Sequence, residues 1–248
     1  MILMAGLGNP GDKYAANRHN VGFMALDRIA SDHGFSPWKP RFQGLVAEGR
    51  LGGQRVTLLK PQTFMNLSGQ SVGEAMRYLK LTPSEVVVLH DELDLAPGVC
   101  RMKTGGGHAG HNGLRSIHQH IGETYRRLRI GIGHPGHKDR VSPYVLSDFA
   151  RSEAEMLDDI LRGISDGAAA LAQGDGSAFG TAFAARVAPP APKPPRRPQA
   201  VPPLPDDAAL TEPRPRSPQG EPQSTPRPEP QSTGTMADRL RALTDRFR

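Results

Sequence analysis

The sequence contains a histidine and an aspartate whose surroundings suit acid–base chemistry. His19 lies in the run Arg18-His19-Asn20, and Asp91 ends the apolar run at 85–90, which is typical of a buried strand. Histidine titrates near neutral pH, and a carboxylate partner fixes which ring nitrogen carries the proton. A histidine held by a carboxylate is therefore the usual unit for activating water. Taken alone, a surface histidine and a helix-capping aspartate remain the commoner explanation of two such residues.

Three asparagines stand in loop-like contexts. Asn9 lies in the run GNPG, Asn66 follows TFM, and Asn112 lies in HNG. Turn formation is the common role of asparagine in such places. An asparagine side chain also offers both a donor and an acceptor, so that it can pair with a peptide bond. Both interpretations stay open at this point.

The glycine-rich stretch at 104–113, TGGGHAGHNG, suggests a phosphate loop or a metal site. Gly105 and Gly110 have the spacing of a P-loop, but His111 and Asn112 replace its lysine and hydroxyl residue, which excludes nucleotide binding of that kind. His108 and His111 are three residues apart, yet the chain has a single cysteine and no H-E-x-x-H run. Exposed loop histidines are therefore favoured over a metal site.

Strands that alternate with helices must position these residues. The apolar patterns predict strands or helices over nine segments: strands at 1–7, 43–50, 54–60, 85–90, 99–103 and 127–132, and helices at 20–33, 68–79 and 112–120. A further helix is predicted at 152–172, and the helical pattern of this region closes by about residue 187. This order indicates an α/β fold: a single globular domain with a mixed central β-sheet flanked by helices.

The composition changes sharply after residue 187. Residues 189–230 hold 16 of the 24 prolines and no aromatic residue, so we expect a disordered proline-rich linker over 188–234. Residues 235–248 predict a short amphipathic helix with one apolar stripe, made by Met236, Leu240, Leu243 and Phe247. Such a short helix is marginal alone, so we expect it to dock on the domain at 1–187 or on a partner.

The bulk properties narrow the class of protein. The net charge of +6 fits an acidic partner such as nucleic acid without requiring one. Cys100 is the single cysteine, so the chain has no intrachain disulfide, and the N-terminus lacks the features of a signal peptide. No apolar run approaches the roughly 18–20 residues that span a bilayer. We expect a cytoplasmic monomer with no membrane association.

Six sequence blocks stand out along the chain: GLGNPG at 6–11, RHNVG at 18–22, PQTFMNLSG at 61–69, HDELD at 90–94, GGGHAGHNGL at 105–114 and RLRIGIGHPG at 127–136. Together they resemble the bacterial-type peptidyl-tRNA hydrolases. They are spread over most of the expected domain at 1–187. The tail from about residue 188 departs from the family pattern.

The resemblance implies a function in translation and ribosome rescue. Members of this family hydrolyse the ester between a peptide and the 3′ ribose of tRNA, so the implied partner is peptidyl-tRNA, and no metal or organic cofactor is implied. The resemblance implies that His19 is the general base for the attacking water and that Asp91 orients and polarises His19. Asn9, Asn66 and Asn112 are implied to bind the peptide and ester region, and Tyr14 and Met65 to shape the cleft.

Lys103 and Arg129 match the family's clamp for the 5′-phosphate of tRNA. The glycine-rich stretch is then a wall of the cleft that delivers Asn112, and a contribution of His111 to catalysis stays open. An alternative is a catalytically idle RNA-binding or RNA-processing relative with the same fold. The presence of His19, Asp91 and the three asparagines favours the enzyme.

Overall fold

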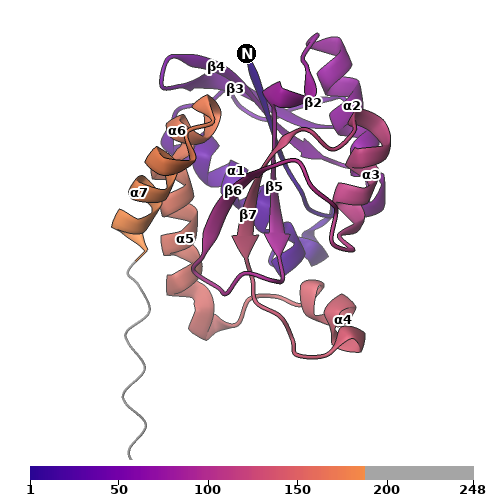
Figure 1. Cartoon of the computed structure of the whole chain (residues 1–248), viewed down its shortest axis with the longest axis vertical. Coiled ribbons are helices and arrows are strands. Elements are labelled where there is room, and N and C mark those ends of the chain that lie inside the picture. The colour runs from indigo at the N-terminus through magenta and orange to yellow at the C-terminus, as the bar shows by residue number, and fades with distance from the viewer. Residues whose placement is uncertain (188–248) are drawn as a thin grey trace, which may run out of the picture. The chain divides into compact units, whose positions relative to one another are not determined.

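A computed structural model describes residues 1–187, in which a seven-stranded mixed sheet carries helices on both faces (Figure 1). The strands are β1 (Ile2–Gly6), β2 (Lys39–Arg41), β3 (Gly44–Leu51), β4 (Gln54–Pro61), β5 (Val86–Glu92), β6 (Cys100–Thr104) and β7 (Arg126–Gly131). They lie in the order β2-β3-β4-β1-β5-β7-β6. The central strands β4, β1, β5 and β7 are parallel, while β2, β3 and β6 pair antiparallel at the two edges. The predicted α/β class with a mixed sheet is confirmed.

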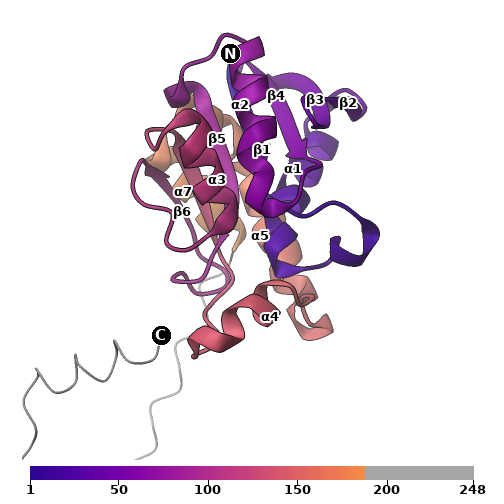
Figure 2. The ribbon, with the colours of Figure 1, turned by 90° about the vertical axis from the view of Figure 1, so that its right-hand side faces the viewer.

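Helices cover the two faces of this sheet unequally. They are α1 (Val21–Asp32), α2 (Ser68–Tyr78), α3 (Asn112–Ile121), α4 (Val141–Val145), α5 (Ala154–Asp166), α6 (Ala168–Gln173) and α7 (Gly176–Arg186). Helices α1, α5, α6 and α7 pack on one face, and α2 and α3 pack on the other (Figures 1 and 2).

The alternation of side chains along the central strands builds both cores. In β1, Met4 packs with α1 and α5 while its neighbours Leu3 and Ala5 pack with α2 and α3. All of these side chains are fully buried. Because both faces of β1 and β5 are covered, these strands read as continuous apolar runs, which is how the sequence predicted them.

The fold differs from the sequence-based expectation in three places. The helical pattern at 152–172 forms two helices, α5 and α6, which are separated at Gly167. A Cβ on Gly167 would lie 2.6 Å from a ring carbon of Phe179, so the close packing of α7 requires glycine at this junction. The edge strand β2 and the short helix α4 were not predicted, because three and five residues are too few to show a period.

The parallel strands direct their carboxyl ends toward one side of the molecule, where α4 lies (Figure 1). In open sheets of this kind, ligands bind beyond the carboxyl ends of the strands. Within the described part of the chain, no helix is long and apolar enough to cross a membrane. The predicted linker at 188–234 and the predicted helix at 235–248 lie outside the described residues.

Candidate active site

A cavity of about 1050 Å³ opens at the carboxyl ends of β1, β4 and β5, between α3 and α4. Eight of the nine residues proposed from the sequence line it: Asn9, His19, Met65, Asn66, Asp91, Lys103, Asn112 and Arg129. The strands explain this convergence, since Asn9 follows β1, Asn66 follows β4 and Asp91 lies near the end of β5. The ninth residue, Tyr14, is half-buried in a separate turn and does not line the cavity.

His19 and Asp91 form a hydrogen-bonded pair at the cavity wall. His19 lies on a short 3-10 turn, Arg18–Asn20, that leads into α1. Its Nδ1 atom is 2.9 Å from each carboxylate oxygen of Asp91, and both residues are buried. Because the carboxylate accepts the Nδ1 proton, Nε2 keeps its lone pair and is the basic atom of the pair.

A second histidine also binds Asp91. His111 Nε2 lies 3.0 Å from Asp91 Oδ1. The other ring nitrogen of His111, Nδ1, accepts hydrogen bonds from the backbone amides of Gly113 and Leu114 and so caps α3. Since Nδ1 is an acceptor, Nε2 carries the proton and donates it to Asp91. The glycine-rich stretch therefore brings His111 to Asp91 as well as Asn112 to the cavity lining, and the sequence did not predict this contact of His111.

Electrostatics raise the pKa of His19 and lower the pKa of Asp91. Burial opposes a charge on His19, but the negative charge of Asp91 and its hydrogen bond raise the pKa of His19 above 6.5. Burial likewise opposes a charge on Asp91, but His19 and His111 together hold the pKa of this carboxyl below its ordinary value. Asp91 is therefore an anion at neutral pH.

His90 adds no charge to this cluster. Burial and the neighbouring His111 lower the pKa of His90 to about 3, so its imidazole is neutral. Its Nδ1 lies 2.7 Å from the backbone carbonyl oxygen of Asp91, to which it donates. His90 thereby supports the backbone of Asp91 through this hydrogen bond, and its ring centre lies 5.2 Å from that of His111.

Asn9 is fixed by three hydrogen bonds that join the loop after β1 to the start of α1 and to the turn after β4. Asn20 accepts from the Asn9 backbone amide through Oδ1 and donates to the Asn9 carbonyl through Nδ2, both at 2.9 Å. Asn9 Oδ1 accepts in turn from the backbone amide of Met65 at 2.9 Å. Within residues 1–187, Asn9 Nδ2 has no side-chain or backbone partner, which leaves it as a free donor on a residue that lines the cavity. Asn20 was not proposed from the sequence, although it belongs to the RHNVG block.

The remaining substrate-side residues differ in exposure. Asn66 and Asn112 are exposed, which suits amides that meet a ligand. Met65 is 5% exposed and packs in the core shared by α2 and α3, so it supports the cavity wall as much as it lines it. A Cβ on Gly113 would lie 2.6 Å from Met65 Sδ, which shows how closely α3 approaches this wall.

Lys103 and Arg129 lie on the antiparallel pair β6–β7 at one end of the cavity. Lys103 is exposed, whereas the Arg129 Nε atom is 2.8 Å from Glu92 Oε2 in a partly buried ion pair. Arg129 thus retains its terminal nitrogens for a ligand while Glu92 holds the side chain in place. A guanidinium held in this way suits a bidentate contact with phosphate.

One group among the described residues has the donor types of a metal site: His19, Asp91 and His111, whose donor atoms lie within 4.8 Å of one another. These atoms already satisfy one another in the two histidine–carboxylate hydrogen bonds. His108, which the sequence paired with His111, lies outside this group and accepts a hydrogen bond from the Gly110 amide.

Comparisons with known proteins match most of this chain to peptidyl-tRNA hydrolases. A family model described as peptidyl-tRNA hydrolase matches residues 3–189. A peptidyl-tRNA hydrolase of Paracoccus denitrificans is 68% identical over 248 residues and is matched over the full length of both chains. A peptidyl-tRNA hydrolase of Cereibacter sphaeroides is 69% identical over 193 residues, which cover 78% of this chain and 86% of the relative. The tail from residue 188 is thus included in the match to the first relative.

A solved structure shares the fold as well as the sequence. The crystal structure of peptidyl-tRNA hydrolase from Acinetobacter baumannii superposes with a TM-score of 0.70 at 43% identity, and covers 75% of this chain and 96% of that one. The family match and the two bacterial relatives span the strands, turns and helices that carry the cavity. This chain belongs to the peptidyl-tRNA hydrolase family.

Proposed function

We propose that this protein hydrolyses the ester that joins a peptide to the 3′ ribose of tRNA, releasing free peptide and free tRNA. The observation that carries the proposal is the His19–Asp91 pair, with Nδ1 and the carboxylate 2.9 Å apart, at the wall of a cavity in a chain of the peptidyl-tRNA hydrolase family. An ester is activated enough that water and a general base suffice for its hydrolysis.

His19 acts as the general base through Nε2. Asp91 accepts the Nδ1 proton and orients the ring, so Nε2 takes a proton from a water molecule as its oxygen attacks the ester carbonyl. The tetrahedral intermediate then collapses, the bond to the ribose 3′ oxygen breaks, and the proton on Nε2 passes to that oxygen. His111 steadies the carboxylate of Asp91 throughout, since it donates to the same oxygen that His19 contacts.

The asparagines bind the peptide side of the substrate. Asn9 Oδ1 is occupied by the Met65 amide, which leaves Asn9 Nδ2 as the donor toward substrate. Asn66 and Asn112 present exposed amides on the neighbouring walls. A peptide amide can pair with such groups, whereas the free amine of an aminoacyl-tRNA leaves a partner unpaired, at a cost of about 1–3 kcal/mol. Tyr14 stays a prediction, because it lies outside the cavity lining.

Lys103 and Arg129 bind phosphate of the tRNA at the β6–β7 end of the cavity. Support comes from their place on the cavity lining and from Glu92, which orients the Arg129 guanidinium. We further propose that the protein acts as a monomer and without a metal ion.

The direct test is release of peptide from an N-blocked aminoacyl-tRNA. His19→Ala is expected to lower kcat by about 10² to 10⁴-fold while the chain folds normally, because it removes the general base. His33→Ala is the matched control, since His33 bonds the Ser165 carbonyl far from the cavity lining and its loss should leave turnover unchanged. Turnover of His19→Ala near the wild-type rate would refute the assignment.

A further inference from the structure

Two consecutive arginines on β7 bind backbone carbonyls on opposite faces of the sheet. Arg126 donates through Nε to the Ser84 carbonyl at 3.0 Å and through Nη1 to the Leu171 and Ala172 carbonyls at 3.3 and 3.2 Å. Arg127 donates through Nη1 to the Gly107 carbonyl at 2.8 Å. Adjacent strand residues project to opposite faces, so one arginine reaches the end of α6 and the other reaches the glycine-rich stretch.

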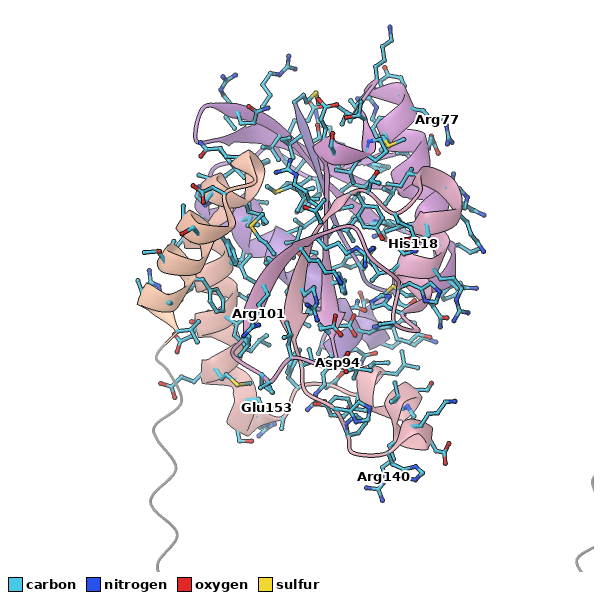
Figure 3. The ribbon with its side chains drawn as sticks, in the orientation of Figure 1. Arg77, Asp94, Arg101, His118, Arg140 and Glu153 are labelled. Carbon is cyan, nitrogen blue, oxygen red and sulfur yellow. The ribbon has the colours of Figure 1, made fainter. Side chains whose placement is uncertain are left out.

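Arg127 fastens that stretch at two successive carbonyls. Its Nη2 atom donates to the Gly106 carbonyl, next to the Gly107 carbonyl that Nη1 holds. Nη2 also lies 3.0 Å from His118 Nε2, on the side of α3 that faces the strands (Figure 3). The planar fork of a guanidinium matches two adjacent acceptors in a way that an ammonium does not.

The charge on Arg127 has no acidic partner. The residue is 2% exposed, and within residues 1–187 no carboxylate lies within 4.0 Å of its nitrogens. Its Nε atom is buried without a hydrogen-bond partner there, and its guanidinium lies 4.8 Å from the centre of the Tyr125 ring. The Glu123 carboxylate reaches it only through His118, at 3.7 Å from His118 Nδ1. A buried cation without a carboxylate in direct contact is costly, so the Gly106 and Gly107 carbonyls are its main direct compensation.

The segment that Arg127 holds has little regular structure of its own. Gly105, Gly106 and Gly110 have φ values of +69°, +89° and +79°, and Ala109 has a φ of +46°. Its backbone ties are few: the Gly105 amide donates to the Tyr125 carbonyl at 3.1 Å, and the His111 amide donates to the His108 carbonyl at 2.8 Å. The path of the chain into α3 therefore depends on the anchor at Gly106 and Gly107.

The segment ends at the two residues that the cavity needs. His111 bonds Asp91 at 3.0 Å and caps α3, and Asn112 follows it at the cavity wall. A shift of this segment moves both side chains relative to Asp91. We propose that Arg127 is a positioning residue for hydrolysis: by holding the Gly106 and Gly107 carbonyls, it sets His111 on Asp91 and Asn112 against the substrate. The proposal rests on the proposed hydrolase function.

The experiment compares Arg127→Lys and Arg127→Gln with the matched variants Arg126→Lys and Arg126→Gln. Both pairs remove a guanidinium that binds backbone carbonyls, but only the Arg127 guanidinium binds a residue of the cavity lining, Gly107. For Arg127→Gln we expect kcat to fall by about 10- to 100-fold with KM within about threefold of wild type, because catalytic groups misplaced by about 1 Å lose activity on this scale. Arg127→Lys keeps the charge and should still lose kcat, whereas both Arg126 variants should stay within about twofold.

Amide hydrogen exchange gives a second readout that does not depend on turnover. The Gly105 and His111 amides should exchange faster than in wild type in the Arg127 variants. In the Arg126 variants their exchange rates should equal those of wild type. Equal kcat losses in both pairs would show general destabilisation and overturn the proposal. A rise in KM with unchanged kcat would make Arg127 an RNA contact instead, and full activity of Arg127→Lys would show that the fork is not needed.

The two proposals fail in different ways. If wild type released no peptide, the hydrolase function would be wrong, while faster exchange in the Arg127 variants alone would still report an anchored segment. If Arg127→Gln did not fold, Arg127→Lys would decide the matter, since it retains the charge and most of the volume of the arginine. Wild-type kcat and wild-type exchange in that variant would overturn the positioning role.

Discussion

At the scale of single residues, Asp91 binds two histidines through different ring nitrogens. His19 donates from Nδ1, whereas His111 donates from Nε2 because its Nδ1 accepts from the backbone at the start of α3. The two tautomers are therefore opposite: Asp91 fixes that of His19 at Nδ1, and the Gly113 and Leu114 amides fix that of His111 at Nδ1. The basic nitrogen of the pair is His19 Nε2, and the rate should report its protonation.

The pH dependence of kcat/KM tests this assignment. The base must be neutral, so activity should fall as the pH drops through the pKa of His19, which Asp91 raises above 6.5. In Asp91→Asn the raising charge is lost and burial remains, so the limb should move to lower pH. The plateau should fall, but by less than in His19→Ala, because the base survives. If the acidic limb of the kcat/KM profile stayed at the same pH in Asp91→Asn, the limb would report the titration of a group other than His19.

Transition-metal chelation tests the metal-free mechanism. The donor atoms of His19, Asp91 and His111 already satisfy one another, so 1,10-phenanthroline is expected to leave kcat unchanged. This chelator spares the Mg²⁺ that tRNA structure needs. Loss of activity that zinc restores would mean that these three residues hold a metal during turnover.

At the scale of elements, the ladder between β6 and β7 places cations opposite one another. Lys103 faces Arg127, and Arg101 faces Arg129, in the antiparallel register. Like charges directly opposite in a sheet are destabilising, and Glu92 relieves the repulsion only at Arg129. Lys103 and Arg129, which belong to this ladder and line the cavity, are better satisfied with an anion bound between them, as expected for a phosphate clamp.

A two-by-two comparison of variant and substrate end tests the clamp. Lys103→Ala and Arg129→Ala should raise KM by about tenfold for tRNA with a 5′-monophosphate, since a charge-assisted contact is worth about 1.5–3 kcal/mol. Both variants should have little effect on substrates without that phosphate. Arg101→Ala is the control, because Arg101 shares the ladder but does not line the cavity. Equal losses on both substrates would mean that these residues support the fold or bind RNA elsewhere.

At the scale of the whole molecule, both cores of the described residues are built by segments that precede the proline-rich segment. The core on the α1 side extends to Phe183 on α7, and the family match ends at residue 189. The match to the Cereibacter sphaeroides relative spans 193 residues, so a shared domain of this length recurs among relatives. Catalysis and stability should therefore depend on the first part of the chain.

Truncation after Ala188 is expected to leave the melting temperature and kcat nearly unchanged. Residues 189–230, which make up most of the removed segment, are rich in proline and lack apolar periodicity, so they contribute little burial. The short helix expected at 235–248 should add a modest gain at most if it docks on the domain. The arginines of the removed segment should add weak attraction to tRNA that salt screens, so a small rise in KM is expected at low salt only. A large fall in melting temperature, or a kcat loss that persists at high salt, would place the tail in the fold or the site.

The sequence by itself determined the main strands and the site residues that lie near their ends. Continuous apolar runs predicted β1 and β5, and each run places a polar residue of the site at or after its end, Asn9 after β1 and Asp91 near the end of β5. The motif blocks added His19 and the other asparagines. These features are local or follow from sheet topology, which is why they could be predicted without coordinates.

Only the tertiary structure decided which side chains bond one another. The contacts of Asp91 with His19 and His111 join residues 72 and 20 positions apart, and the Arg127 anchor depends on how a glycine-rich segment folds back on β7. The same structure placed Tyr14 outside the cavity and divided α5 from α6 at Gly167. Periodicity reports only neighbours within a few turns, whereas these contacts arise from packing between distant segments, so no local pattern could specify them.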